Sequence, residues 1–369
     1  MKVGFFSPLP PARTGVADYS SELLRALKTH GPIAVNSASA DIPLYHLGNN
    51  PFHREIYKRA LKKPGVIVLH DAVLHHFFLG AMREPDYVSE FVYNYGAWSE
   101  DLARHFWGHR ARAGADAEFF EYPMIKRVVE RSLGVIVHNP RAAAMVARHA
   151  PEATVYEIPH LFAAPQHPPA GFEAARLRQQ LGIAPHVFLF GVFGYLRESK
   201  RLASVLRAYQ RASRDAEMAL LVAGEFVSAN FARSVEPLLG AGRGIVRMPY
   251  LAERDFWRYA AAVDACINLR YPAAGETSGI AIRLMGLSKP VLLSDGAETS
   301  RFPEDVRLGV DPGLAEEEML AEYMVWLARF PDDARAIGRR AAAYISQCHS
   351  PVRVARLYWD ALAACYHRI

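Results

Sequence analysis

Residues 268–295, NLRYPAAGETSGIAIRLMGLSKPVLLSD, decide the fold class of this chain. A short apolar run that ends at Leu269 leads into a loop rich in breaking residues, 271–275. Apolar side chains then recur over 280–287 at the spacing of a short buried helix. A proline ends that helix, and residues 291–293 are typical of a second strand. The order strand, loop, helix, strand predicts an α/β unit with a parallel sheet.

The junction between this loop and the helix carries Glu276, Thr277, Ser278 and Gly279. The first N–H groups of a helix lack partners and lie at the positive end of its dipole, so a helix start attracts phosphate. Thr277 or Ser278 could cap the helix, and Gly279 would let a ligand approach the backbone. Taken alone, these residues fit a phosphate-binding turn and a well-capped helix without a ligand equally well.

This segment resembles the donor-binding segment of the retaining family 4 glycosyltransferases of the GT-B fold. Glu276 matches the first Glu of the family's motif, Gly279 matches its Gly, and residues 289–291 match its ending, with Ser288 in place of the usual Gly. The family's second Glu is absent, because its place falls on Leu284 when counted forwards and on Arg283 when counted back from the ending. The resemblance implies that Glu276 holds hydroxyl groups of a donor sugar, while the usual ribose contact lacks its carboxylate.

A basic loop follows the strand predicted at 187–193 and contains Arg197, Lys200 and Arg201. The dipole of the next helix disfavours cations at its start, so an anionic ligand would explain them; a solvated basic loop is the alternative. FGYLRESKRL resembles the Arg and Lys diphosphate clamp of the same family. Lys200 matches the Lys, whereas the family's Arg falls on Tyr195, so Arg197 or Arg201 must replace it if the clamp exists.

Two further loops in this half are candidates for the nucleoside site. Gly224 follows the strand predicted at 219–222, and Tyr250 follows the strand predicted at 245–248. In the family these two regions flank the nucleotide base. The resemblance therefore implies nucleoside binding by Gly224 and Tyr250, with Arg283 near the place of the missing Glu.

The start of the chain predicts another β–α unit, with a strand, a Pro-rich loop and a helix over residues 2–27. No GxGxxG occurs, so a dinucleotide cofactor is not expected. PPARTGVADYSSELLRAL resembles the opening of the family, in which a Gly loop approaches the donor diphosphate, and Gly15 matches that Gly. An ordinary turn is the alternative. Asp18 is either a charge at the helix start or a residue that binds the acceptor.

An apolar strand predicted at 65–69 is followed by His70 and Asp71. The polar groups at the carboxyl end of such a strand face the crevice where doubly wound sheets bind ligands. VLHDAVLHH resembles the family segment whose His lies near the transferred sugar; His70 is the match, and Asp71 would orient a ring or bind the acceptor. Capping and packing are the alternative roles, which we favour for His75 and His76. Zinc is not expected, since neighbouring histidines do not share a helix face.

The segment 87–112 is rich in aromatic residues and ends in basic ones. We expect most of these aromatic side chains to form the core of a helical insertion. Some could instead line an acceptor groove, and a basic aromatic helix can also lie on a membrane surface.

The composition is that of a globular protein, with 51% apolar and 22% charged residues among 369 and a net charge of +5. The mild basicity fits an anionic donor, an acidic acceptor or a membrane surface, and it excludes the dense basic block of a dedicated nucleic-acid binder. The three scattered cysteines have no metal spacing and favour a reducing compartment. No stretch approaches the ~18 apolar residues of a membrane span. We therefore expect a cytoplasmic protein, with peripheral contact at the inner face of the membrane as an alternative.

The whole pattern predicts two Rossmann-like, doubly wound domains that face a central cleft, the GT-B fold. The Pro- and Gly-rich residues 161–185 are the best linker. We expect an acceptor-binding domain at 1–165 and a donor-binding domain at 166–350. The helix at 351–369 should pack back on the first domain, as in GT-B proteins.

The resemblance implies transfer of a sugar from a nucleotide-sugar donor to a glycan or lipid-linked glycan acceptor with retention of configuration. His70, Glu276 and Lys200 are the catalytic candidates. Arg197, Arg201 and the N–H groups of residues 277–279 would help to bind the diphosphate. No Asp-x-Asp occurs, so neither a metal nor another cofactor is expected. The alternatives are a degenerate protein that binds a nucleotide sugar without turnover, and another GT-B enzyme such as an epimerase.

Overall fold

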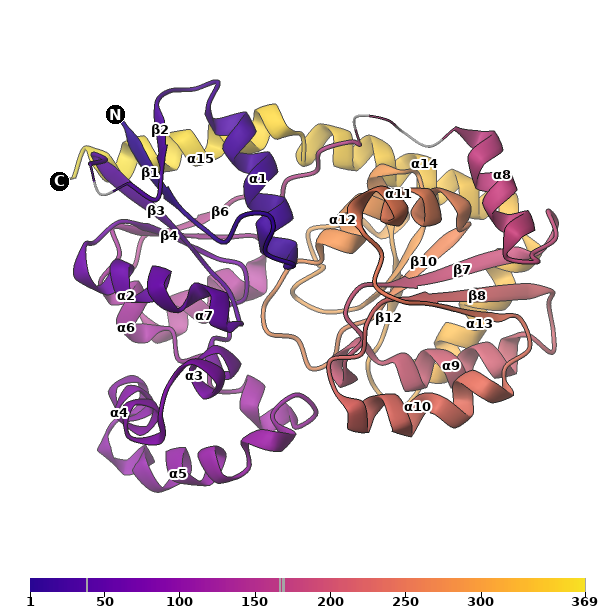
Figure 1. Ribbon diagram of the computed structural model, residues 1–369, viewed down its shortest axis with the longest axis horizontal. Coiled ribbons are helices and arrows are strands. Elements are labelled where there is room, and N and C mark those ends of the chain that lie inside the picture. Colours follow the sequence, from indigo (N-terminus) through magenta and orange to yellow (C-terminus); the bar gives the residue numbers. More distant parts are fainter. Residues whose placement is uncertain (38, 166, 168–169, 369) are drawn as a thin grey trace. The chain divides into compact units, whose positions relative to one another are not determined.

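The computed structural model describes residues 1–37, 39–165, 167 and 170–368, and the chain divides into two compact units (Figure 1). The first unit comprises Met1–Leu161, Pro272–Thr277 and Cys348–Ile369. The second comprises Phe162–Tyr271 and Ser278–Gln347. Each unit contains a six-stranded sheet flanked by helices. The predicted α/β class, with two doubly wound halves, is therefore confirmed.

The first sheet is parallel and has the strand order β2-β1-β3-β4-β5-β6. Its strands are β1 (Val3–Phe6), β2 (Ile33–Val35), β3 (Ile42–Leu47), β4 (Val66–Leu69), β5 (Gly134–Val137) and β6 (Val155–Glu157). The four central strands are buried along their whole length, as expected of parallel strands covered on both faces. The strand order reverses between β1 and β3, and ligands of such sheets bind outside the carboxyl ends of the strands at this switch point.

Eight α-helices belong to the part of the first unit that the structure describes. They are α1 (Gly15–Leu27), α2 (Arg54–Lys62), α3 (His75–Ala81), α4 (Glu84–Tyr95), α5 (Glu100–Gly108), α6 (Lys126–Glu130), α7 (Pro140–His149) and α15 (Pro351–Tyr366). Helix α15 packs against α1, where the hydroxyl groups of Tyr19 and Tyr358 lie 2.8 Å apart in a buried contact. Ile369 lies outside the described residues.

The aromatic segment forms helices α4 and α5 of the insertion between β4 and β5. Tyr87, Phe91 and Phe106 are fully buried there, so the interpretation of these aromatic side chains as core is confirmed. Tyr93 and Trp98 are exceptions, with 39% and 72% of their surfaces exposed.

The second sheet is also parallel and has the order β12-β11-β10-β7-β8-β9. Its strands are β7 (Phe188–Phe193), β8 (Met218–Ala223), β9 (Ile245–Met248), β10 (Ala265–Asn268), β11 (Val291–Ser294) and β12 (Leu308–Val310). The helices of this half are α8 (Gly171–Gln180), α9 (Leu202–Ala212), α10 (Ala229–Ala241), α11 (Glu253–Ala262), α12 (Gly279–Gly286), α13 (Glu316–Arg329) and α14 (Pro331–Cys348). The switch point lies between β7 and β10, so the loops after these two strands are in the position to bind a ligand.

The predicted linker is wrong in its second part, because helix α8 occupies Gly171–Gln180. The helix contacts α11, and Leu177 is buried between them and the sheet. Gly182 has a φ of +70° and ends the helix, with its N–H donating to Gln179 O. The glycines that suggested a loop therefore mark the two ends of a helix. Gln166, Pro168 and Pro169, which contain the expected domain boundary and part of the linker, lie outside the described residues.

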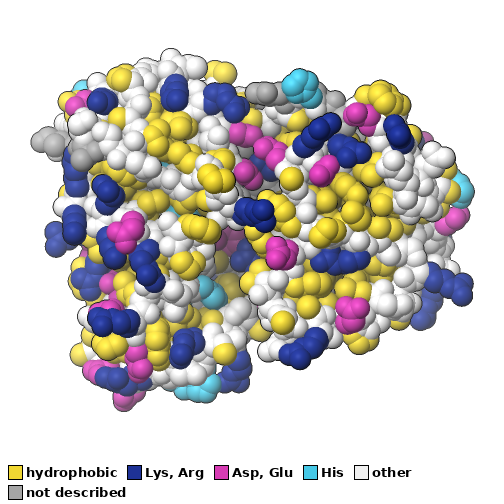
Figure 2. Space-filling view, in the orientation of Figure 1, with side chains coloured by type: hydrophobic (Ala, Val, Ile, Leu, Met, Phe, Trp, Pro, Cys, Tyr) yellow, Lys and Arg dark blue, Asp and Glu magenta, His cyan; other side chains and the backbone are white. Residues whose placement is uncertain are grey.

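The face of the molecule in Figure 2 shows lysine and arginine side chains interspersed with acidic and apolar ones. Within the residues placed by the structure, no helix is long and apolar enough to cross a membrane.

Candidate active site

The predicted site residues lie in loops that follow the strands of each sheet and in the helices α1 and α12. The first unit contains Gly15, Asp18, His70, Asp71, Glu276 and Thr277. The second contains Arg197, Lys200, Arg201, Gly224, Tyr250, Ser278, Gly279 and Arg283. The candidate site thus consists of two half-sites, one in each unit.

The N-terminus of α12 organises the half-site of the second unit. Ser278 is the N-cap, and its Oγ accepts a hydrogen bond from the N–H of Ala281 at 3.3 Å. Of the two caps that the sequence left open, Ser278 is thus the one used. Gly279 begins the helix, so the unbonded N–H groups of the first turn face outward from this point. Arg270, at the end of β10, donates from Nη2 to Ser278 Oγ at 3.4 Å.

Lys200 lies beside the same helix start. Its side chain is only 5% exposed, and Nζ donates to the carbonyl of Phe193 at 2.7 Å. Gly194 has a φ of +90°, and a Cβ there would lie 2.6 Å from Ile280 in the first turn of α12 and 2.9 Å from Lys200 Nζ. Glycine at this turn therefore allows the lysine and the helix start to approach one another.

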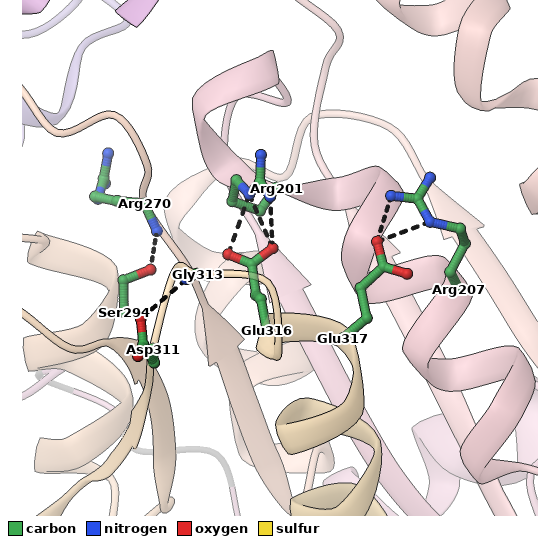
Figure 3. A network of polar contacts seen from close by, with 8 residues as sticks. All are labelled: Arg201, Arg207, Arg270, Ser294, Asp311, Gly313, Glu316 and Glu317. Carbon is green, nitrogen blue, oxygen red and sulfur yellow. Dashed lines mark hydrogen bonds and ion pairs between the residues drawn. The ribbon is translucent and has the colours of Figure 1, made fainter.

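The other two cations of this loop differ in their surroundings. Arg201 is bound to Glu316, with Nη2 to Oε1 at 2.8 Å and Nε to Oε2 at 3.1 Å, and Glu316 is 2% exposed (Figure 3). The charge of Arg201 is therefore compensated by a buried carboxylate at the start of α13. Arg207, further along in α9, makes a similar pair with Glu317 (Figure 3). Arg197 is exposed.

Two nucleoside candidates, Gly224 and Tyr250, follow β8 and β9, and the third, Arg283, lies in α12. The ring of Tyr250, 39% exposed, lies 6.0 Å from the ring of Tyr195. A Cβ on Gly224 would lie 1.9 Å from the carbonyl oxygen of Gly194, so the packing of two strand ends already requires glycine at this position. The guanidinium of Arg283 lies over two aromatic rings of α11, 5.6 and 5.4 Å from their centroids.

The loop Pro272–Thr277 is bound to the first unit through its backbone. The N–H groups of Ala72 and Val73 donate to the carbonyl of Ala274 at 2.8 and 2.9 Å. Asn139, at the start of α7, donates from Nδ2 to Gly275 O at 2.9 Å and to Thr277 Oγ1 at 3.0 Å. Glu276 Oε2 accepts the N–H of Ala274 at 2.7 Å, which fixes its carboxylate within the loop. The loop that carries Glu276 is thus anchored directly after the His70–Asp71 segment.

His70 belongs to a cluster of buried rings. Its Nε2 lies 2.9 Å from Nδ1 of His46, on β3. The ring of Tyr19 meets it edge-on with centroids 5.0 Å apart, and the ring of His138 lies 5.4 Å away. Burial, reinforced by the neighbouring histidines, lowers the pKa of both His70 and His46 well below 6.5. Both rings are therefore neutral at pH 7.

The remaining candidates of the first unit are less buried. Asp71 Oδ2 accepts the N–H of Asn49 at 2.8 Å. Gly15 is the first residue of α1, and a Cβ there would meet no atom within 4 Å. Asp18 lies in the first turn of the same helix. The fold itself thus gives no steric reason for glycine at position 15.

Three residues that the sequence reasoning missed take part in these half-sites: Arg270, His46 and Asn139. Each is a polar residue within or just after a buried strand, which is the available signal. Their contacts with Ser278, His70 and the Glu276 loop depend on which strands pair, and a single sequence does not state the strand order.

Comparisons with known proteins identify solved structures that have the same fold. No protein-family model and no curated protein matches the chain. Among solved structures, Anabaena HepE in complex with UDP-glucose is similar with a TM-score of 0.70 and 15% identity, covering 99% of this chain and 100% of that one. Sucrose-phosphate synthase from Thermosynechococcus elongatus has a TM-score of 0.69 and 14% identity, with 99% and 100% coverage.

WaaG, a glycosyltransferase involved in lipopolysaccharide biosynthesis, is similar with a TM-score of 0.62 and 14% identity, covering 98% of this chain and 99% of that one. Similarity over the full length confirms that the chain has the GT-B fold. At such identity the likeness shows the fold alone.

Proposed function

We propose that the protein is a retaining glycosyltransferase that moves a sugar from a nucleotide-sugar donor to a hydroxyl acceptor. The observation that carries the proposal is a cluster of two cationic side chains and one helix N-terminus in the second unit. Lys200, Arg270 and the N-terminus of α12 converge at the carboxyl ends of β7 and β10. Positive groups at the switch point of a doubly wound sheet favour an anionic ligand such as a diphosphate.

The same groups would favour the reaction. As the bond between the anomeric carbon and the diphosphate breaks, negative charge grows on the leaving oxygen, and fixed positive groups stabilise it there. The acceptor oxygen forms the new bond to the anomeric carbon on the same face, and its proton passes to the leaving phosphate. Glu276 would hold hydroxyl groups of the sugar, and His70 would contact the transferred sugar.

We assign the acceptor to the first unit and most contacts of the donor nucleotide to the second, with Gly15 as a further residue that would approach the diphosphate. Arg270 joins Lys200 as the second cation, since Arg201 is already paired with a buried carboxylate. Tyr250 and Gly224 would border the base, and Asp71 and Asp18 the acceptor. UDP and UDP-sugars are the first ligands to test, because HepE structures contain UDP-glucose and UDP.

A thermal-shift screen with UDP, GDP, ADP, dTDP and their sugars tests donor binding. A ligand at a hundred times its Kd adds about 2.7 kcal/mol of stability. The shift should shrink in Lys200→Ala and remain in Lys289→Ala. Lys289 is the control, because it is also a lysine of the second unit, is partly buried, and donates to a backbone carbonyl, that of Ala261, at 2.9 Å. A lack of any shift with every nucleotide would contradict the proposal.

Turnover of the bound donor separates the enzyme from a non-catalytic binding protein. Release of nucleotide and sugar from the intact donor, slowed in Glu276→Ala, would support transfer chemistry. Binding without any turnover by the parent protein would favour the degenerate alternative. Full activity of Glu276→Ala would contradict the assignment of this carboxylate, and formation of an epimeric sugar would favour the other alternative.

A further inference from the structure

The contact between His46 and His70 joins two nitrogen atoms that can each either donate or accept. In a neutral imidazole one nitrogen carries the proton and the other has a lone pair. The contact of 2.9 Å therefore has two forms. Either His46 Nδ1–H donates to His70 Nε2, or His70 Nε2–H donates to His46 Nδ1. The two forms present opposite chemistry at His70 Nδ1.

The surroundings of His46 distinguish these forms. His46 is fully buried, and its Nε2 has no hydrogen-bond partner among the described residues. Donation by His70 would place the proton of His46 on this isolated nitrogen and leave a buried N–H without an acceptor. Orphaned buried N–H groups are rarer in folded proteins than under-satisfied acceptors. The proton of His46 is thus better placed on Nδ1, in the contact with His70.

A second observation agrees with this assignment. Other buried histidines of the first unit carry their proton on Nδ1, since this atom faces a backbone carbonyl, which only accepts. His53 Nδ1 lies 2.9 Å from His46 O, and His138 Nδ1 lies 2.9 Å from Ile158 O. Their Nε2 atoms, like that of His46, are buried without a partner among the described residues. Unpartnered ring acceptors are therefore tolerated in this core.

We infer that His46 is a positioning residue that holds His70 in the tautomer with Nε2 as acceptor and Nδ1–H as donor. His70 keeps 8% of its surface exposed, and Nδ1 makes no hydrogen bond to the residues that the structure describes. This N–H is then available to an oxygen of the transferred sugar. Burial lowers the pKa of both rings well below 6.5, which keeps the pair neutral and the tautomer defined.

The inference rests on the proposed function and narrows the role of His70. The only lone pair of His70 is occupied by His46, so His70 cannot accept the proton of an attacking hydroxyl group. It acts as a hydrogen-bond donor to a substrate oxygen, and the proton must leave by another route. This fits transfer of the proton to the departing phosphate.

Nitrogen NMR of histidine-labelled, ligand-free full-length protein tests the tautomer, because protonated and unprotonated ring nitrogens resonate far apart. A His70→Asn spectrum assigns the signal. The parent protein should show protonated Nδ1 and unprotonated Nε2 at His70. His46→Asn keeps an N–H near the place of Nδ1 and should preserve this pattern, whereas His46→Leu removes the donor and should abolish it. His53→Asn, which keeps the donor to the His46 carbonyl, should leave it unchanged.

Turnover of the donor gives the second readout. His46→Leu should lower kcat/KM by about five- to tenfold, the effect of one hydrogen bond, and His46→Asn should retain most of the activity. A protonated Nε2 at His70 in the parent protein would overturn the inference. So would a His46→Leu variant that keeps the Nδ1 tautomer and full activity. Because the tautomer is read without substrate, failure of nucleotide binding would remove the proposed function without changing this result.

Discussion

Acidification should destabilise the first unit strongly, because its core contains histidines that are neutral when folded. Burial lowers the pKa of His53, His138 and His349 to about 4 in each case, against 6.5 for an exposed ring, although a hydrogen bond to a carbonyl partly opposes the shift. Below pH 6.5 these histidines bind protons in the unfolded chain but stay neutral in the folded chain. The free energy of unfolding is therefore unaffected by these rings above pH 6.5, and it decreases as the pH falls from 6.5 towards 4.

The size of the effect follows from these values. Between pH 7 and pH 5 each of the three histidines should lower the free energy of unfolding by about 2 kcal/mol, on the order of 5 kcal/mol together. That loss is comparable with the whole stability of a typical domain, roughly 5–15 kcal/mol. Urea unfolding followed by circular dichroism at pH 7, 6 and 5 measures it. If the two units unfold separately, the transition of the first unit should carry the change.

Two variants make the test specific. His349→Asn keeps a donor for the carbonyl of His160, which His349 contacts at 2.6 Å, and removes one titrating ring. It should reduce the difference between pH 7 and pH 5 by about 2 kcal/mol. His186→Asn is the control, since the His186 side chain is 69% exposed, and it should leave the difference unchanged. Equal stability of the parent protein at pH 7 and pH 5 would refute the reasoning.

Three further changes have defined outcomes. Gly15→Ala should change the free energy of unfolding by less than about 0.5 kcal/mol, but it should weaken nucleotide binding by about tenfold or more in a titration. Gly171→Ala is the control and should change neither quantity, because Gly171 also begins a helix and has no atom within 4 Å of an added Cβ. Glu316→Ala should lower the free energy of unfolding by about 2 kcal/mol, because its arginine partner loses a buried carboxylate; an unchanged urea midpoint would contradict this. Leu284→Glu should cost more than about 4 kcal/mol by burying a charge, whereas Arg283→Glu should fold; equal melting temperatures would contradict the difference.

Local patterns were sufficient to predict most of the fold. The strand at 245–248 and the end of the first helix at Leu27 were predicted at their observed bounds, because apolar runs and breakers coincide there. Helix α8 was hidden by glycines at its two ends. Helix α10 was not predicted either, since its sequence has Pro237 and its face buries only Phe231 and Val235.

The contacts of the predicted site residues could not be predicted in the same way, because they depend on which strands are neighbours in each sheet. The sequence indicated Lys200 and the start of α12 as separate anion-binding features, and the structure places both against Gly194. It could not show that Arg201 is held by Glu316, which lies 115 residues away along the chain. The partner of His70 was equally hidden, since His46 is a single polar residue within an apolar strand. The roles of all these residues stay predictions.

The missing second Glu has a physical explanation in helix α12. Leu284 is fully buried in a core of apolar side chains, so a carboxylate at this position would be desolvated without a partner. The neighbouring Arg283 lies over the rings of Phe256 and Trp257, which hold its guanidinium by cation–π contacts. A nucleoside next to this helix would therefore meet a cation where the related motif has an anion. Such a site cannot accept hydrogen bonds from both ribose hydroxyl groups through a side-chain carboxylate here, because a guanidinium only donates. If a ribose binds here, its oxygen atoms would act as acceptors for Arg283. Arg283→Gln restores an acceptor oxygen, so the ratio of the affinity for the nucleotide to the affinity for its 2′-deoxy form should rise in this variant. An unchanged ratio would place the ribose elsewhere.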